Sequence, residues 1–244
     1  MNQEQNFDYV VITLDIDWAP DFVIENVLDI MSKFNVKSTF FMTHASSSIS
    51  RIRKNPLFEL GIHPNFLPKS TQGRNPKEIL QNLKNIIPEA TSVRTHSLVQ
   101  STLLLEEFSQ FDLKNDVSIF LPNCNNLRPV YIDFQKVLRF PFFWEDDLEM
   151  REKQNWDISK FKFHEYGLKI FNFHPIYIYL NSKNMTNYNI IKNEIGLDKI
   201  TDDNISQYIN SEKGAKTFFL DLLNTINPKK SFTINELHNL FFEK

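Results

Sequence analysis

The chain has 244 residues, of which 41% are hydrophobic, and its formal net charge is −3. This length predicts one large domain, residues 1–244, with a sizeable buried core, because two domains of ordinary size and a linker would need a longer chain. Basic and acidic residues are mixed along the sequence, which argues against a nucleic-acid-binding surface and against a polybasic membrane anchor. The expected partner is therefore a small molecule or a neutral polymer.

The amino terminus and the single cysteine give expectations about location. Residues 1–15 (MNQEQNFDYVVITLD) begin polar and acidic, without the cationic region of a secretory signal. Their apolar run is too short to span a bilayer. Cys124 is the single cysteine, which excludes an internal disulfide and indicates a reducing compartment. We therefore expect a cytoplasmic protein without a membrane span.

The first two thirds of the chain alternate β-rich runs with helical patterns. Apolar periodicity predicts helices over 21–34 and over 76–87, the second with Pro76 in its first turn and Asn75 as its N-cap. Strands are predicted over 9–15, 37–43, 58–63, 91–96, 117–121, 137–143 and 168–174. Repeated strand–helix–strand units imply parallel strands with right-handed crossovers.

Seven strands in one α/β domain favour an irregular (β/α)7 barrel over an open doubly wound sheet. The barrel core is expected at about residues 8–180. The remainder, about 181–244, is polar at first and then has helical patterns over 215–226 and 234–242. It is expected to form a helical cap on the barrel.

Chemically active side chains follow the predicted strands, at the ends where active sites of β/α barrels lie. Each has an ordinary structural explanation by itself: an aspartate can cap a helix, a lone histidine is more often structural, and a tryptophan among phenylalanines is more often core. Their joint placement at one rim predicts an active site. The residues concerned are Asp15, Asp17, Trp18, His44, His63, Asn65, Arg94, His96, Trp144, Asp146 and His174.

Such a set suits the hydrolysis of an amide. This reaction needs an activated water, a stabilised oxyanion and a proton for the departing amine. A divalent metal held by imidazoles and a carboxylate activates water and polarises the acyl oxygen. In an Asp-x-Asp pair at a strand end, one carboxylate can bind the metal while the other remains free as a base.

Six short motifs, in this order, resemble those of the NodB-homology polysaccharide deacetylases (carbohydrate esterase family four), and most of all their WbmS-like branch. They are LDIDW, STFFMTH, ELGIHPNF, VRTHSL, FPFFWEDD and FNFHP. The resemblance runs from about residue 10 to residue 175. It implies a distorted seven-stranded β/α barrel, a divalent metal, usually zinc, and a role in making bacterial surface polysaccharides.

The resemblance also implies roles for residues that match the family's motifs. Asp15 corresponds to the general base and Asp17 to a metal ligand. His63 corresponds to a second ligand, and Arg94 to the arginine that orients the catalytic aspartate. His174 corresponds to the acid that protonates the leaving group, and Trp144 and Asp146 correspond to the tryptophan and acid that precede it.

The chain departs from the family pattern at two places. The family's second motif has another histidine four residues after the first, where this chain has Leu67. His96 is our substitute for the missing ligand, since its side chain should share a strand face with Arg94, and His44 is the reserve. The aspartates of the first motif are also separated by one residue, where many relatives have them adjacent.

These observations predict a metal-dependent deacetylase that removes an N-acetyl group from an amino sugar, free or linked to a nucleotide or lipid carrier. Asp17, His63 and His96 would bind the metal. The candidate sugar contacts are Trp18, Asn65, Trp144 and Asp146. Two alternatives are a metal-dependent hydrolase of another bond, such as an ester, and a carbohydrate-binding barrel that has lost its metal, which the absent histidine at position 67 would favour.

Overall fold

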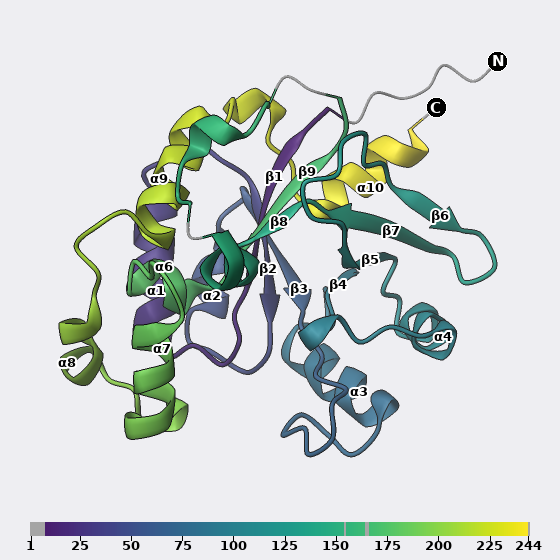
Figure 1. Ribbon diagram of the computed structural model, residues 1–244. Helices are drawn as coiled ribbons and strands as arrows, with labels where there is room; N and C mark the ends of the chain where they lie inside the picture. The colour runs from purple at the N-terminus through teal and green to yellow at the C-terminus, as the bar shows by residue number, and fades with distance from the viewer. Residues whose placement is uncertain (1–7, 154, 164–165, 244) are drawn as a thin grey trace.

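The computed structural model describes residues 8–153, 155–163 and 166–243 (Figure 1). The strands are β1 (Val10–Asp15), β2 (Ser38–Met42), β3 (Phe58–Ile62), β4 (Ser92–Val93), β5 (Asn115–Phe120), β6 (Val130–Ile132), β7 (Val137–Phe142), β8 (Trp144–Glu145) and β9 (Lys169–Phe173). The α-helices are α1 (Asp21–Met31), α2 (Ile49–Lys54), α3 (Pro76–Ile86), α4 (Thr102–Gln110), α5 (Asp146–Leu148), α6 (Pro175–Tyr179), α7 (Thr186–Ile190), α8 (Asp202–Ile205), α9 (Ala215–Thr225) and α10 (Ile234–Phe242). Across these described residues, every helix is too short or too polar to cross a bilayer.

The strands form one sheet in the order β6-β7-β5-β4-β3-β2-β1-β9-β8. Neighbouring strands pair in parallel, except in the antiparallel β6–β7 hairpin. The parallel strands expected from the strand–helix alternation are thus confirmed, and their carboxyl ends meet at one edge.

The two ends of the sheet are joined by one extended segment. Only Phe143 separates β7 from β8, so residues 137–145 pair with β5 at their start and with β9 at their end. The N–H of Phe143 itself donates to the carbonyl of Ile170 in β9 at 2.9 Å. This arrangement closes β1 to β5, the joined β7–β8 segment and β9 into an irregular barrel, as the sequence predicted.

Local sequence explains where the predicted elements begin and end. In α3, Pro76 occupies the first turn and the Asn75 side chain accepts the N–H of Glu78 at 3.0 Å, as expected. The strand predicted over 91–96 is shorter than expected. It stops at Val93 because the chain turns away from the sheet, and Ser97 and Leu98 adopt left-handed backbone angles. This early turn releases His96 from the sheet.

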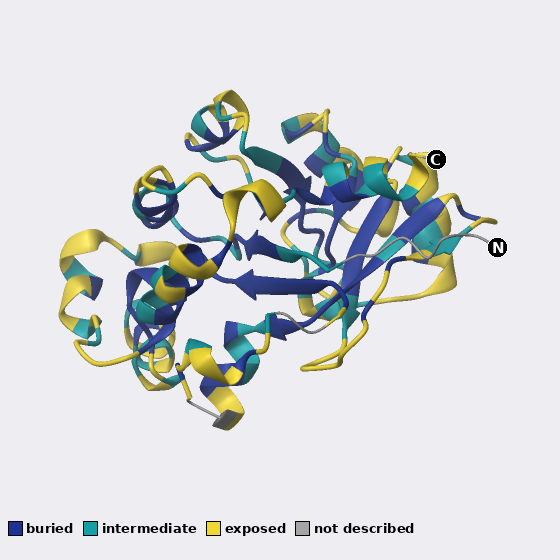
Figure 2. Cartoon of the chain, turned by 90° about the horizontal axis from the view of Figure 1, so that it is seen from above, coloured by how far each residue is buried: buried dark blue, intermediate teal, exposed yellow. Residues whose placement is uncertain are grey.

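The strands are largely buried, and exposed residues lie on the outer faces of helices and loops (Figure 2). Helix α9 packs against α6 on the outside of the barrel (Figure 1). Helix α10 contacts the amino ends of two strands: the N–H groups of Ile234 and Asn235 donate to Thr39 Oγ1 (3.0 Å) and Glu59 Oε2 (2.9 Å). The last helix of the segment expected as a cap therefore lies at the barrel end opposite the rim.

Candidate active site

The turn after β1 carries two aspartates. Asp15 is the last residue of β1 and only 4% exposed, and Asp17 follows Ile16. Asp17 and Trp18 have φ angles of 42° and 57°, a left-handed conformation that residues other than glycine rarely adopt. A hydrogen bond from the N–H of Trp18 to Thr43 Oγ1 (3.0 Å) holds the turn. Strain of this kind is concentrated at functional sites, and here it directs Asp17 towards the ends of β3 and β4.

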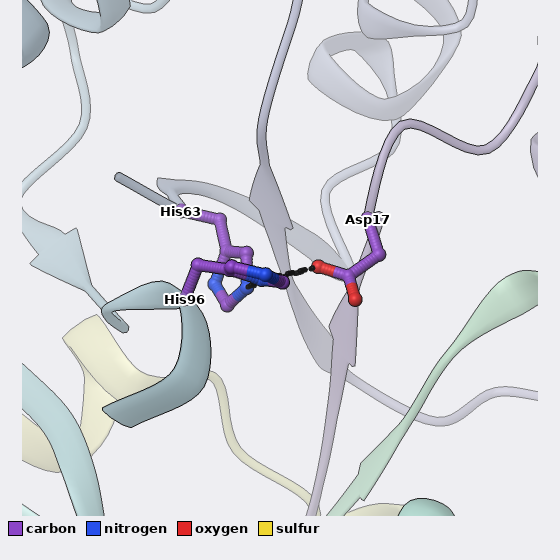
Figure 3. Close-up of side chains that lie close together, drawn as sticks. All are labelled: Asp17, His63 and His96. Atoms are coloured by element: carbon purple, nitrogen blue, oxygen red, sulfur yellow. Dashed lines mark hydrogen bonds and ion pairs between the residues drawn. The ribbon is translucent and has the colours of Figure 1, made fainter. Parts of the chain in front are cut away.

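Asp17, His63 and His96 point toward one another from three separate strand ends (Figure 3). Asp17 Oδ1 lies 3.2 Å from His63 Nε2 and 3.0 Å from His96 Nδ1. The two imidazole nitrogens are 3.3 Å apart. Three potential ligand atoms thus occupy the corners of a small triangle.

This triangle has the dimensions of one face of a tetrahedral zinc site. Ligand atoms at about 2.0–2.1 Å from a tetrahedral ion are about 3.3 Å from one another. The donor set, two imidazoles and one carboxylate, is also one that zinc prefers. Burial disfavours a charged Asp17, but hydrogen bonds from His63 and His96 outweigh it and hold the pKa of Asp17 far below its usual range. The residues present therefore fit a divalent metal.

Asp15 lies beneath this triangle in a buried network. Arg94, which is fully buried, donates from Nη1 to Asp15 Oδ1 at 3.1 Å and to Thr13 Oγ1 at 2.9 Å. It also donates from Nε to the Val117 carbonyl at 2.9 Å. Burial raises the pKa of Asp15, but the charge of Arg94 outweighs it and the net pKa is lowered. Asp15 is therefore a carboxylate at neutral pH.

Asn172 belongs to the same network and was missed by the sequence analysis. Its Nδ2 donates to Asp15 Oδ2 at 2.8 Å, and its Oδ1 accepts from Arg94. The signal for it was present, because Asn172 of β9 precedes His174, which directly follows this strand, by two residues, and period two gives both side chains the same face. An amide can donate to a carboxylate and accept from a guanidinium at once, which is what this position requires.

His174 is held by Asp146 through two contacts. Its Nδ1 lies 2.7 Å from Asp146 Oδ1, and its backbone N–H donates to Asp146 Oδ2 at 2.8 Å. Its other ring nitrogen, Nε2, lies 3.7 Å from Asp17 Oδ2. Burial lowers the pKa of His174, but the charge of Asp146 dominates and raises it well above the usual value. His174 is therefore protonated at neutral pH and faces the Asp17 side of the site.

Two of the residues expected to contact a sugar are buried elsewhere. Asp146 is fully buried under His174. Trp144 is 3% exposed, its ring stacks on Phe218 of α9 at 4.7 Å, and its Nε1 donates to Glu149 Oε2 at 3.0 Å. Because neither side chain presents a free surface, we withdraw both from the candidate sugar contacts.

The other candidates lie at the rim. Trp18 and Asn65 are partly exposed, and the Trp18 ring packs edge-on against His96 at 5.2 Å. His44 instead pairs with its neighbour, with Nδ1 2.8 Å from Thr43 Oγ1, and is outside the triangle. Leu67, where relatives carry the second histidine, is 40% exposed. The geometry thus brings His96, rather than His44, to Asp17 and His63.

Comparisons with known proteins agree with this barrel fold. Residues 12–192 match the family described as WbmS-like polysaccharide deacetylase. The chain belongs to this family, which confirms the resemblance seen in its motifs and makes it a member of a hydrolase family.

Solved structures give the same result. The WbmS protein of Bordetella bronchiseptica, described as a polysaccharide deacetylase involved in O-antigen biosynthesis, is 32% identical, with a TM-score of 0.81 over 92% of this chain and 94% of that one. A Mycobacterium smegmatis protein described as a polysaccharide deacetylase is 12% identical, with a TM-score of 0.50 over 96% and 95%, and shares the fold. A search of curated proteins gave no match.

Proposed function

We propose that this chain is a metal-dependent deacetylase that removes an N-acetyl group from an amino sugar during synthesis of a bacterial surface polysaccharide. The observation that carries the proposal is the triangle of Asp17, His63 and His96 directly above the ionised Asp15. The description of its Bordetella relative, which names O-antigen biosynthesis, supports the biological setting. Under this proposal the reaction occurs in the cytoplasm, on a sugar carried by a nucleotide or a lipid before export.

Asp17, His63 and His96 would hold the divalent metal, which we propose is zinc because zinc prefers these donors. When bound, such an ion supplies a Lewis acid that makes water acidic and polarises the acyl oxygen. Three protein ligands are the number that catalytic zinc sites use, whereas structural zinc sites use four.

Two side chains would move the protons. Asp15 takes a proton from the water whose oxygen forms the new bond to the acyl carbon, and Arg94 and Asn172 keep its carboxylate ionised and oriented. His174 donates its Nε2 proton to the amine nitrogen as the carbon–nitrogen bond breaks. Asp146 stabilises the imidazolium before this transfer. The products are acetate and the free amine.

Trp18 and Asn65 are the proposed sugar contacts, because both are partly exposed, Trp18 packs against His96, and Asn65 follows His63 by two residues. An aromatic ring and an amide suit the apolar face and the hydroxyl groups of a pyranose. The proposal assigns them to binding, so that their loss should raise KM more than it lowers kcat.

Elemental analysis of the purified protein tests the proposal, with His63→Ala and His96→Ala as test variants and His44→Ala as the matched control. We expect near-stoichiometric metal in the wild type and in His44→Ala, and its loss in the other two. Acetate release should then be measured with free, nucleotide-linked and lipid-linked N-acetylated sugars. Release from an O-acetylated sugar alone would point to an ester. Absence of metal after reconstitution with zinc would overturn the hydrolytic proposal in favour of a binding role.

A further inference from the structure

The tripeptide His63-Pro64-Asn65, which follows β3, has its backbone polar groups bonded to neighbouring segments. The N–H of His63 donates to the Met42 carbonyl at 2.8 Å, continuing the pairing with β2. The carbonyl of Pro64 accepts the N–H of His96 at 2.9 Å. This last bond joins the backbones of the two segments that carry the imidazoles of the triangle.

Gln72 makes the remaining bonds to this tripeptide. Its side-chain Nε2 donates to the carbonyl of His63 at 3.1 Å and to the carbonyl of Thr43 at 2.8 Å. Its Oε1 accepts the N–H of Asn65 at 2.6 Å. The side-chain amide is a neutral group with two donors and one acceptor, and here each of these is used on backbone groups. Gln72 therefore fastens the ends of β2 and β3 and the start of the following loop to one another.

The position of Gln72 is fixed from the other side by α3. Its carbonyl accepts Nδ2 of Asn82 at 2.8 Å. The next residue, Gly73, packs so closely that a Cβ atom would lie 2.9 Å from the backbone nitrogen of Ile79. Gln72 itself is only 8% exposed. Helix α3 thus fixes the position of Gln72, whose side-chain amide bonds to the residues that follow β2 and β3.

We propose that Gln72 is a positioning residue that aligns His63 directly, and His96 through Pro64, for metal binding. The inference rests on the proposed function, because it concerns the metal site of that function. In this chain the loop after His63 offers Leu67, an exposed side chain that cannot coordinate a metal, at the position of the relatives' second histidine. The loop is tied to the protein by the Gln72 amide. Groups that orient metal ligands typically contribute 10- to 100-fold to metal affinity.

The test compares Gln72→Met, which keeps the length of the side chain and removes its hydrogen bonds, with Gln81→Met as a matched control. Gln81 is exposed on α3 and bonds only to Asn85 among the described residues. The readouts are the dissociation constant for Zn2+, by competition with a chelator, and the visible spectrum of the Co2+-loaded protein. Thermal unfolding of the metal-free proteins shows whether each variant is folded.

We expect Gln72→Met to weaken Zn2+ binding at least tenfold and to change the Co2+ spectrum, while Gln81→Met matches the wild type. Equal zinc affinity, within twofold, and an unchanged spectrum in Gln72→Met would overturn the inference. If Gln72→Met does not fold, Gln72→Glu, which keeps the acceptor for Asn65 but loses both donors, serves for the same comparison. A wild type that binds neither ion would instead refute the proposed function, a result distinct from failure of the inference.

Discussion

The Asp146 carboxylate bonds to both the ring and the backbone of His174. Its Oδ1 lies 2.7 Å from Nδ1, and its Oδ2 accepts the backbone N–H at 2.8 Å. A single carboxylate thus fixes the place of the imidazole and its charge. The same residue pair links the end of β8 to the end of β9, because Asp146 begins α5 and His174 precedes α6.

Replacing Asp146 by asparagine should therefore impair proton donation more than binding. Asp146→Asn keeps the shape of the side chain but removes the charge that stabilises the imidazolium. Because general acid catalysis contributes roughly 100- to 10,000-fold, we expect kcat at neutral pH to fall at least tenfold with KM changed less than threefold. Steady-state kinetics measure this, and Asp133→Asn, at an exposed position in the turn between β6 and β7, is the control. An unchanged kcat would show that His174 does not act as the acid.

Arg94 and Asp15 form a buried ion pair, so the effect of replacing one on stability should depend on the other. Arg94→Met would leave Asp15 in the barrel without its cation, and breaking a buried pair from one side costs about 3–5 kcal/mol. The double variant Arg94→Met/Asp15→Asn, which removes the stranded charge as well, should recover part of this loss. Unfolding in urea measures the free energy of unfolding of the wild type, of the two single variants and of the double variant. A double variant as unstable as the sum of the two single variants would mean that the two residues act independently.

Glu145 should make the unfolding free energy depend on pH. It follows Trp144 in β8, and its pairing with Asn172 turns its side chain into the barrel. Burial raises the pKa of Glu145 to about 7 from its usual 4.5. The folded chain therefore holds a proton that the unfolded chain has lost between these values, so this group's contribution to stability decreases as pH rises from about 4.5 to about 7.

Glu145→Gln removes this contribution. We expect the variant to gain stability relative to the wild type over that pH range, by an amount on the order of 1–3 kcal/mol at pH 8. Urea unfolding of the metal-free proteins at several pH values gives the difference, with Glu152→Gln, at an exposed position on the following turn, as the control. A difference that does not change between pH 4.5 and 8 would contradict the burial of the Glu145 carboxyl.

The two tryptophans near the site should respond differently to removal. Trp144→Ala empties a packed aromatic cluster on Phe218 and should lower the unfolding free energy by about 3–5 kcal/mol. Trp18→Ala should cost much less stability, because Trp18 is partly exposed, and should instead raise KM. Unfolding and kinetics on the same preparations distinguish the two. Equal losses of stability would mean that Trp18 is also a core residue.

Much of the fold followed from local sequence patterns. The alternation of β-rich runs with helical patterns predicted the parallel strands, and Asn75 with Pro76 indicated the start of α3. Strand order at one rim was enough to assemble Asp15, Asp17 and His63, because the carboxyl ends of parallel strands meet. The β6–β7 hairpin and the two-residue β8 were not predicted, since their short runs carry little periodicity.

Side-chain direction was harder to predict. The sequence predicted that Trp144 and Asp146 lie at the rim. In the structure, the Trp144 side chain points outward to α9, and Asp146 lies beneath His174. Gln72 gave no signal in the sequence, and the spacing of Asn172 from His174 indicated only the face on which Asn172 lies, because an amide becomes informative only when its partners are known. These contacts depend on tertiary packing, which sequence periodicity does not encode.

The joined β7–β8 segment separates the site into two parts along the chain. The triangle comes from residues 17–96, which follow β1, β3 and β4, whereas Asp146 and His174 come from the segments that close the barrel. β9 pairs in parallel with β1, and His174, which follows β9, has its Nε2 3.7 Å from Asp17 Oδ2. Closure of the barrel thus adds the proposed proton donor and its aspartate to metal-binding groups that all come from the first 96 residues.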